Sequence, residues 1–238
     1  MANEASAAGQ LPGLRDRLML WFGGLSLPAM LSVGIYASQM VMTRTADQAG
    51  EALHTSAMAA AELLGANLRE RELEIALLSQ APHFVAGNLE HPHVLKSMER
   101  RVRLRDEFAW MGVTDAEGRV VQSVNGLLVG ADVAQRPWFI AGLKGVHAGD
   151  VHEAVLLAKL LPAQASGEPL RFIDFAAPII GGNGQVIGVL GAHAHWSWVT
   201  RTVEVVARRH AADRDIEILV ASGDGTILYP EPGRTPAR

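Results

Sequence analysis

The first hydrophobic segment of the chain spans residues 18–43, which contain no charged side chain. About 20 consecutive apolar residues are enough for a helix to cross a bilayer. Arg15 and Arg17 precede the segment and only Arg44 follows it closely, and such a cationic excess marks the cytoplasmic end of a membrane helix. We therefore predict an uncleaved transmembrane helix at residues 18–43, with residues 1–17 in the cytoplasm and the rest outside the inner membrane. A cleaved signal peptide is the alternative, but the segment is long for one and no small-x-small cleavage site closes it.

An amphipathic pattern follows over residues 44–80, which are rich in the helix formers Ala, Leu, Glu and Arg. Apolar side chains recur there at spacings near three, four and seven, as on one face of a helix. The stripe consists of Leu53, Ala57, Ala60, Leu64, Leu68, Ile75 and Leu78. We predict a long stalk helix that ends before Pro82 and forms a homodimer with a second copy. Packing of the same stripe onto the following domain is the alternative.

Beyond a stretch broken by Pro82 and Pro92, the pattern changes to that of strands. Residues 108–115 and 119–124 flank a short turn and predict a hairpin. Residues 170–180 and 186–196 flank the glycine-rich turn GGNGQ and predict a second hairpin.

The connections between these hairpins have their own signals. Residues 131–145 are expected to form a helix, with Asp132 as its N-cap. The sequence GDVHEAVLL is a further strand candidate, and residues 162–169 are expected to form a loop. Residues 196–213 predict another helix, which the tryptophans of WSW are expected to anchor by packing. We predict an α+β fold: a transmembrane helix, a stalk helix and an antiparallel sheet of about five strands with a helical insertion.

An internal similarity affects the expected domain organisation. Residues 111–124 and 218–230 share an apolar strand, a small turn ending in glycine and a second apolar strand. A two-stranded hairpin is not stable alone. We therefore predict a sensor module at residues 97–200, a connecting helix at residues 201–214 and the truncated start of a second module at residues 215–238. The alternative is that the last hairpin extends the first sheet.

Composition and motifs exclude several classes of function. The 21 basic and 25 acidic side chains give a net charge of −4 without a basic block, so no nucleic-acid partner is expected. Because the chain has no cysteine, thiol catalysis and zinc–thiolate sites are excluded. His152 and Glu153 do not continue into HExxH, since Leu156 takes the place of the second histidine. His193 and His195 alone are too few for zinc, so we expect no catalytic residue, metal or cofactor.

The segment RPWFIAGLKG holds the residues best suited to bind a small molecule. Arg136 offers a planar fork for a carboxylate, and Trp138 offers a large apolar surface. In the later strand, Asp174 shares a face with apolar side chains, where an unpaired carboxylate is costly. Its partner would be a ligand ammonium or an arginine such as Arg136. Asp150 and His152 are expected to border the same pocket. The alternative for the aromatic residues is a helix start that fills the core.

Several segments together resemble the extracytoplasmic Cache sensor domains, which are PAS-like, of bacterial receptors. They are GVTDAEGRVV, DVAQRPWFIAGLKG, GDVHEAVLLAKLLP, LRFIDFAAPI and GQVIGVLGAHAHWSW, and the likeness covers about residues 44–230. In amino-acid-binding members of the family, an Arg-x-Trp-Tyr motif and a downstream Asp hold the ligand. The resemblance implies these roles for Arg136, Trp138 and Asp174, while Phe139 stands where the motif has Tyr.

The resemblance implies a periplasmic sensor that binds an amino acid, an amine or a carboxylate. GDVHEAVLLAKLLP with RFIDFAAPI is most similar to sensors that precede diguanylate cyclase modules. Histidine kinases and chemoreceptors with the same fold are the alternative. A membrane-anchored hydrolase or metalloenzyme is a third hypothesis, which no catalytic constellation in the sequence favours.

Overall fold

The computed structural model describes residues 13–153, 157, 170–211, 218–223 and 225–230. The predicted loop at residues 162–169 and most of the predicted cytoplasmic segment lie outside these residues. The described residues form two units, which divide after Ser56.

The first unit consists of the N-terminal part of helix α1, Leu14–Ser79. The two helices predicted at residues 18–43 and 44–80 are therefore one helix, because good helix formers continue across the predicted boundary. Within the described residues, α1 is the one helix long and apolar enough to cross a membrane, and none of its apolar window is buried. A signal sequence would meet the same criteria, so the membrane anchor stays a prediction.

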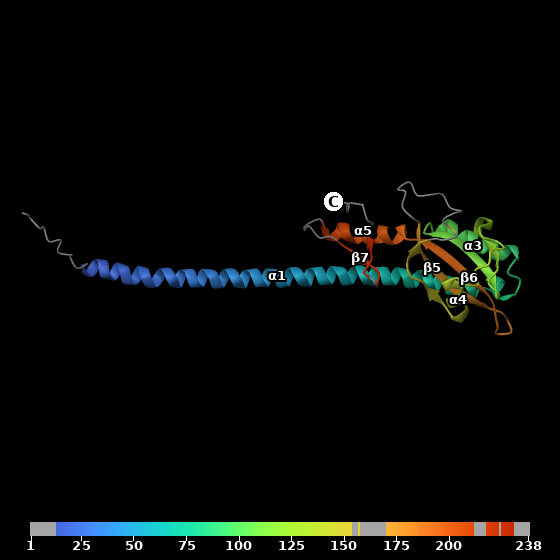
Figure 1. The fold of residues 1–238 in the computed structure, drawn as a ribbon, viewed down its shortest axis with the longest axis horizontal. Coiled ribbons are helices and arrows are strands. Elements are labelled where there is room, and N and C mark those ends of the chain that lie inside the picture. Colours follow the sequence, from blue (N-terminus) through green and yellow to red (C-terminus); the bar gives the residue numbers. More distant parts are fainter. Residues whose placement is uncertain (1–12, 154–156, 158–169, 212–217, 224, 231–238) are drawn as a thin grey trace, which may run out of the picture. The chain divides into compact units, whose positions relative to one another are not determined.

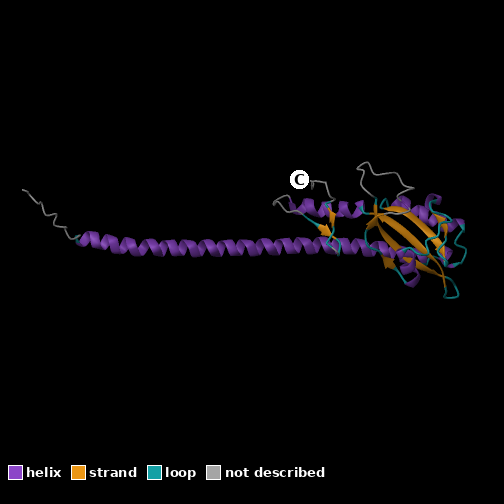
Figure 2. Ribbon diagram, in the orientation of Figure 1, coloured by secondary structure: helices purple, strands orange, loops and turns teal. Residues whose placement is uncertain are grey.

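The second unit begins at Ala57 and contains an antiparallel sheet. Figures 1 and 2 show its strands beside the short helices. The strands are β1 Phe108–Asp115, β2 Val120–Ser123, β3 His147–Ala148, β4 His152–Glu153, β5 Arg171–Ile180 and β6 Val186–His195. In the described part of the chain, their order is β2-β1-β6-β5-β3, and β4 also pairs with β5. Both predicted hairpins and the antiparallel sheet of about five strands are confirmed.

The shorter helices surround this sheet. They are α2 Pro82–Val85, α3 Pro92–Leu104, α4 Pro137–Lys144 and α5 Ser197–Ala211, together with a 3₁₀ turn at Val124–Gly126. Neither α2 nor α3 was predicted from the sequence. Each begins with proline at its first position, where the missing N–H is no loss, so Pro82 and Pro92 start helices.

Strand β5 separates two apolar clusters. Ile173 and Phe175 face a cluster with side chains of α1, α3 and α5, whereas Phe172 and Ala176 face a cluster with Trp138 of α4. The alternation follows from the two-residue period of a strand. Pro178 is tolerated in β5 because the pairing of β3 stops at Ala176 and leaves this edge free.

The predicted helix at residues 131–145 is shorter than expected and begins at Pro137. Asp132 is not its N-cap. The Asp132 carboxylate accepts a hydrogen bond from the Ala134 N–H at 2.9 Å, within the preceding turn. Arg136 holds the N-cap position in an extended conformation. Proline restricts the preceding residue to that conformation, and this moves the helix start to Pro137.

From Ala60 onward, the predicted stripe on α1 belongs to the second unit and packs within it. Ala60, Ile75 and Leu78 are buried, and Leu64 and Leu68 are partly buried against the first cluster. Leu53 is exposed. The alternative interpretation, packing onto the following domain, therefore holds for most of the stripe.

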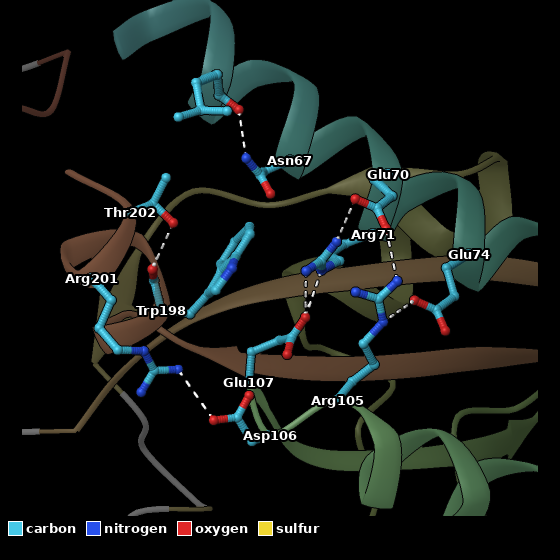
Figure 3. Close-up of polar contacts among 11 residues, drawn as sticks. Asn67, Glu70, Arg71, Glu74, Arg105, Asp106, Glu107, Trp198, Arg201 and Thr202 are labelled. Atoms are coloured by element: carbon cyan, nitrogen blue, oxygen red, sulfur yellow. Dashed lines mark hydrogen bonds and ion pairs between the residues drawn. The ribbon is translucent and has the colours of Figure 1, made fainter. Parts of the chain in front are cut away.

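A polar network also joins the C-terminal part of α1 to the rest of the second unit (Figure 3). Arg71 of α1 is buried, its Nε donates to Glu107 at 2.7 Å, and its guanidinium lies 5.0 Å from the centre of the Trp198 ring. Arg105 donates to Glu70 at 2.7 Å. This hydrogen bond, with the charge of Arg71, lowers the pKa of the Glu70 carboxyl. The network links α1, the α3–β1 connection and the start of α5.

The last described hairpin consists of β7 Val220–Ala221 and β8 Ile227–Tyr229. Among the described residues these strands form their own two-stranded sheet, so the hairpin does not extend the first sheet. The Trp196 indole N–H donates to the Leu228 carbonyl at 3.2 Å, and Tyr229 is buried in the first cluster. The expected packing role of the tryptophans next to α5 is confirmed.

Candidate ligand-binding site

A cavity of about 300 Å³ lies on the face of the sheet that packs against α4. Its size suits a small ligand. The described residues that line it come from the connection before α4, from α4, from the β3–β4 edge and the chain after it, and from β5 and β6: Leu128, Val133, Arg136, Pro137, Trp138, His147, Gly149, Asp150, Val151, His152, Leu157, Phe172, Asp174 and His193. Of the six predicted site residues, five line it and Phe139 does not.

Arg136 supplies a cation to this cavity. It is half-buried at the N-cap of α4, where Pro137 fixes the start of the helix. Its guanidinium makes no hydrogen bond or ion pair with any residue that the structure describes. Since a desolvated cation without a partner is unfavourable, this side chain is well placed to bind an anion.

Trp138 forms an apolar wall of the cavity and is only 5% exposed. A methyl group at Gly191 would lie 2.7 Å from the Trp138 ring, so glycine there lets the indole lie against β6. Phe139 is 2% exposed and packs edge-on against Trp138, with ring centres 6.1 Å apart. The structure therefore places Phe139 in the core behind the wall.

Asp174 has two histidines as partners among the described residues. The register of β5 with β6 puts His193 directly opposite, and His193 Nδ1 contacts Asp174 Oδ1 at hydrogen-bonding distance. His152 Nε2 lies 3.4 Å from the other carboxylate oxygen, Oδ2. Asp174 is 7% exposed and His193 is 8% exposed. Arg136, the arginine expected as one possible partner, forms no ion pair with Asp174.

His193 is the important site residue that sequence reasoning missed. The ring of His193 stacks on Trp110 with centres 4.8 Å apart and meets Trp138 edge-on at 5.8 Å. His195 shares its face but does not line the cavity, and burial, with the nearby charge of Arg201, lowers the pKa of His195. The signal for His193 was its place in the strand that pairs with Asp174.

The rim of the cavity holds the other predicted residues. Asp150 is exposed and accepts a hydrogen bond from the Val151 N–H at 2.8 Å. The His152 side chain is 45% exposed, and His147, which was not predicted as a site residue, also lines the cavity. No group of three or more His, Cys, Asp or Glu side chains in the described ranges is arranged to hold a metal ion.

Sequence comparisons identify no relative. No family model matches the chain, and none of the curated proteins matches it.

Solved structures share the fold. An extracellular ligand-binding receptor from Desulfohalobium retbaense has a TM-score of 0.55 at 16% identity over 73% of this chain and 30% of its own. The ligand-binding domain of the Pseudomonas aeruginosa amino acid chemoreceptor PctC, in complex with GABA, has a TM-score of 0.54 at 17% identity over 76% of both chains. That of PctB, in complex with L-Arg, has a TM-score of 0.56 at 19% identity over 76% of this chain and 65% of its own.

These likenesses show the fold. This chain has the α+β, Cache-like architecture of extracellular ligand-binding domains, as the sequence predicted. The chain spans 30% of the length of the Desulfohalobium retbaense receptor structure.

Proposed function

We propose that this chain is the ligand-sensing region of a bacterial membrane receptor and that it binds a small molecule in the cavity beside α4. The observation that carries the proposal is Arg136, a half-buried cation that lines the cavity without a partner among the described residues. Trp138 and Phe172 supply apolar surface beside it. The sequence resemblance implies an amino acid, an amine or a carboxylate as ligand, and of these the ligands with a carboxylate suit Arg136 best.

The solved structures with the same fold support this assignment. PctC was solved with GABA and PctB with L-Arg, both of which carry a carboxylate. Arginine binds a carboxylate through two parallel hydrogen bonds. We propose that Arg136 has this role here, with Trp138 covering the body of the ligand.

The membrane location rests on the apolar part of α1 and on the likeness to extracellular domains. We propose that residues 18–43 anchor the chain in the inner membrane and that the second unit lies in the periplasm. α1 packs on the face of the sheet opposite the cavity, so a signal would have to cross the sheet. A ligand can drive such a change only if it binds one arrangement more tightly than another.

The chain itself is proposed to have a sensing role and no catalytic role. For the output we propose a diguanylate cyclase, supported by the sequence resemblance of residues 149–162 and 171–179. A chemoreceptor is the second candidate, because the fold likeness includes chemoreceptor domains. The reading frame downstream of residue 238 tests this choice: a cyclase module supports the first and a methyl-accepting coiled coil the second.

Isothermal titration of the full chain in detergent tests ligand binding directly. The probes are the twenty amino acids, short amines and short mono- and dicarboxylates. We expect a carboxylate-bearing probe to bind, and Arg136→Ala to weaken its affinity about 10- to 100-fold, since hydrogen bonds to a charged group contribute about 1.5–3 kcal/mol. Arg103→Ala is the matched control. The Arg103 side chain is 70% exposed, and it lies on α3, which contributes none of the described lining residues.

Two results would contradict the proposal. One is that no probe binds the wild-type chain. The other is that Arg136→Ala and Arg103→Ala bind the same probe as tightly as the wild type does.

A further inference from the structure

We infer that the cavity selects a carboxylate ligand that has no ammonium group, because two histidines already occupy the acidic residue that could hold an ammonium. The residues concerned are Asp174, His193 and His152, with Arg136 as the charge left for the ligand. This inference rests on the proposed function, since it names the ligand class of the same cavity.

The backbone register holds His193 against Asp174. Across the sheet, Trp110 of β1 pairs with His193 of β6, and His193 pairs with Asp174 of β5. Directly opposite residues in antiparallel strands have their Cβ atoms about 4.5–5.5 Å apart on the same face of the sheet. The contact between His193 and Asp174 therefore follows from the pairing of the strands and does not depend on a flexible loop.

Both oxygens of the Asp174 carboxylate face an imidazole nitrogen. Oδ1 contacts His193 Nδ1, and Oδ2 lies 3.4 Å from His152 Nε2. An ammonium could reach either oxygen only by displacing a histidine. His152 is half-exposed, but His193 is held between Trp110, at 4.8 Å, and Trp138, at 5.8 Å. The Oδ1 atom of Asp174, which the buried His193 contacts, is thus closed to a ligand.

The cost of desolvation leads to the same conclusion. A buried carboxylate is costly unless it is hydrogen-bonded, and His193 meets this need at Oδ1 of Asp174. An ammonium entering beside Asp174 would lose its water and would also have to break this contact. Asp150, the other acidic lining residue, is exposed and accepts from a backbone N–H, so water screens its charge.

The opposite holds for an anion. Arg136 has no partner in the described part of the chain, so a carboxylate gains charge-assisted hydrogen bonds there without displacing a protein group. The Nε2 atom of His193 likewise has no hydrogen-bond partner among the described residues, and His193 lines the cavity. Because an imidazole that donates from Nδ1 accepts at Nε2, this atom offers a second contact to a hydroxyl group of the ligand.

Titration of the full chain in detergent with matched pairs of acids tests this selectivity. The pairs differ only by an amino group: butyrate with γ-aminobutyrate, succinate with aspartate, and 4-methylpentanoate with leucine. We expect at least one acid without an amino group to bind the wild type at least about tenfold more tightly than its aminated counterpart, a difference of about 1.4 kcal/mol.

Two variants of His193 identify the cause. His193→Ala frees Oδ1 of Asp174, and His193→Leu frees it while keeping apolar bulk between the Trp110 and Trp138 rings. Both are expected to bind the aminated acid more tightly and to reduce the selectivity about tenfold or more. The second variant keeps the test valid if the first does not fold. His195→Asn is the control, because His195 lies on the same strand and face but makes no contact with Asp174.

The inference is overturned if the aminated acids bind the wild type as tightly as their counterparts. It is also overturned if the folded His193 variants keep the wild-type selectivity, or if His195→Asn changes it as much as they do. Failure of the proposed function looks different, because then no acid of either kind binds, or Arg136→Ala binds the acids as tightly as the wild type.

Discussion

Gly191 shapes the cavity through the side chain it lacks. It lies on β6, and the Trp138 ring occupies the space in which a Cβ atom would project, at 2.7 Å. Trp138 in turn contacts the rings of Trp110 and His193. The position of the apolar wall beside Arg136 therefore depends on one missing methyl group.

A methyl group at this position should displace the wall. We expect Gly191→Ala to destabilise the second unit by about 1–3 kcal/mol, the usual range for an overpacked core, and to weaken ligand binding because Trp138 must move. Thermal unfolding and titration of the full chain measure both effects. Gly182→Ala is the control, since no atom lies within 4 Å of its added methyl group. Unchanged stability and affinity in Gly191→Ala would contradict this account of the wall.

At the scale of the elements, the docking of α1 depends on a buried ion pair as well as on apolar packing. The side chains of Arg71 and Glu107 are 6% and 5% exposed, and the shortest distance between their charged atoms is 2.6 Å. Arg71 also has Glu70 at 2.8 Å and the Trp198 ring beneath its guanidinium. One side chain of α1 thus contacts the α3–β1 connection and α5 (Figure 3).

Breaking this pair should loosen α1 from the sheet. We expect Glu107→Ala to destabilise the second unit by about 3 kcal/mol, the low end of the range for a broken buried pair, because Glu70 remains beside Arg71. This corresponds to a fall in Tm of about 6–12 °C, which intrinsic tryptophan fluorescence can follow. Asp106→Ala is the adjacent control: its side chain is 86% exposed, so a change below about 1 kcal/mol is expected. Equal effects of the two substitutions would contradict a special role for the buried pair.

At the scale of the whole molecule, the proposed function depends on which side of the membrane the second unit occupies. The cationic residues before the apolar segment predict a cytoplasmic N-terminus, and the described part of α1 contains one segment apolar enough to cross. A periplasmic location would expose the cavity to solutes outside the cell.

Reporter fusions test this orientation. Alkaline phosphatase fused after residue 80 should be active, because it folds only outside the cytoplasm, and β-galactosidase at the same point should be inactive. Fusions after residue 15 should give the reverse pattern. β-galactosidase activity behind residue 80 would contradict the proposed location.

The hydrophobic pattern alone determined the main elements, because burial of one face imposes a period on each of them. The alternation in β5 placed Asp174 on the face of Phe172 and Ala176, and the stripe from Ala60 to Leu78 identified the buried side of α1. Local chemistry and the family resemblance together selected Arg136, Trp138, Asp174, Asp150 and His152, which line the cavity, and also Phe139, which does not. It was not enough for α3, whose buried positions are few and whose remaining surface is highly charged.

The tertiary structure decided which groups meet. The pairing of β5 with β6 shifts by one residue between Ile179 and Ile180. This shift places His193 opposite Asp174, where the unshifted pairing would place Ala192. The alternation of apolar and polar residues along a strand does not reveal such a one-residue bulge. The exclusion of Phe139 from the cavity likewise depends on how α4 sits on the sheet, since adjacent helix positions face different neighbours. The sequence by itself determined the types of chemical group near the site, because these follow from local residue identity. Their pairing was decided only in three dimensions, because it depends on strand register and helix packing between distant segments.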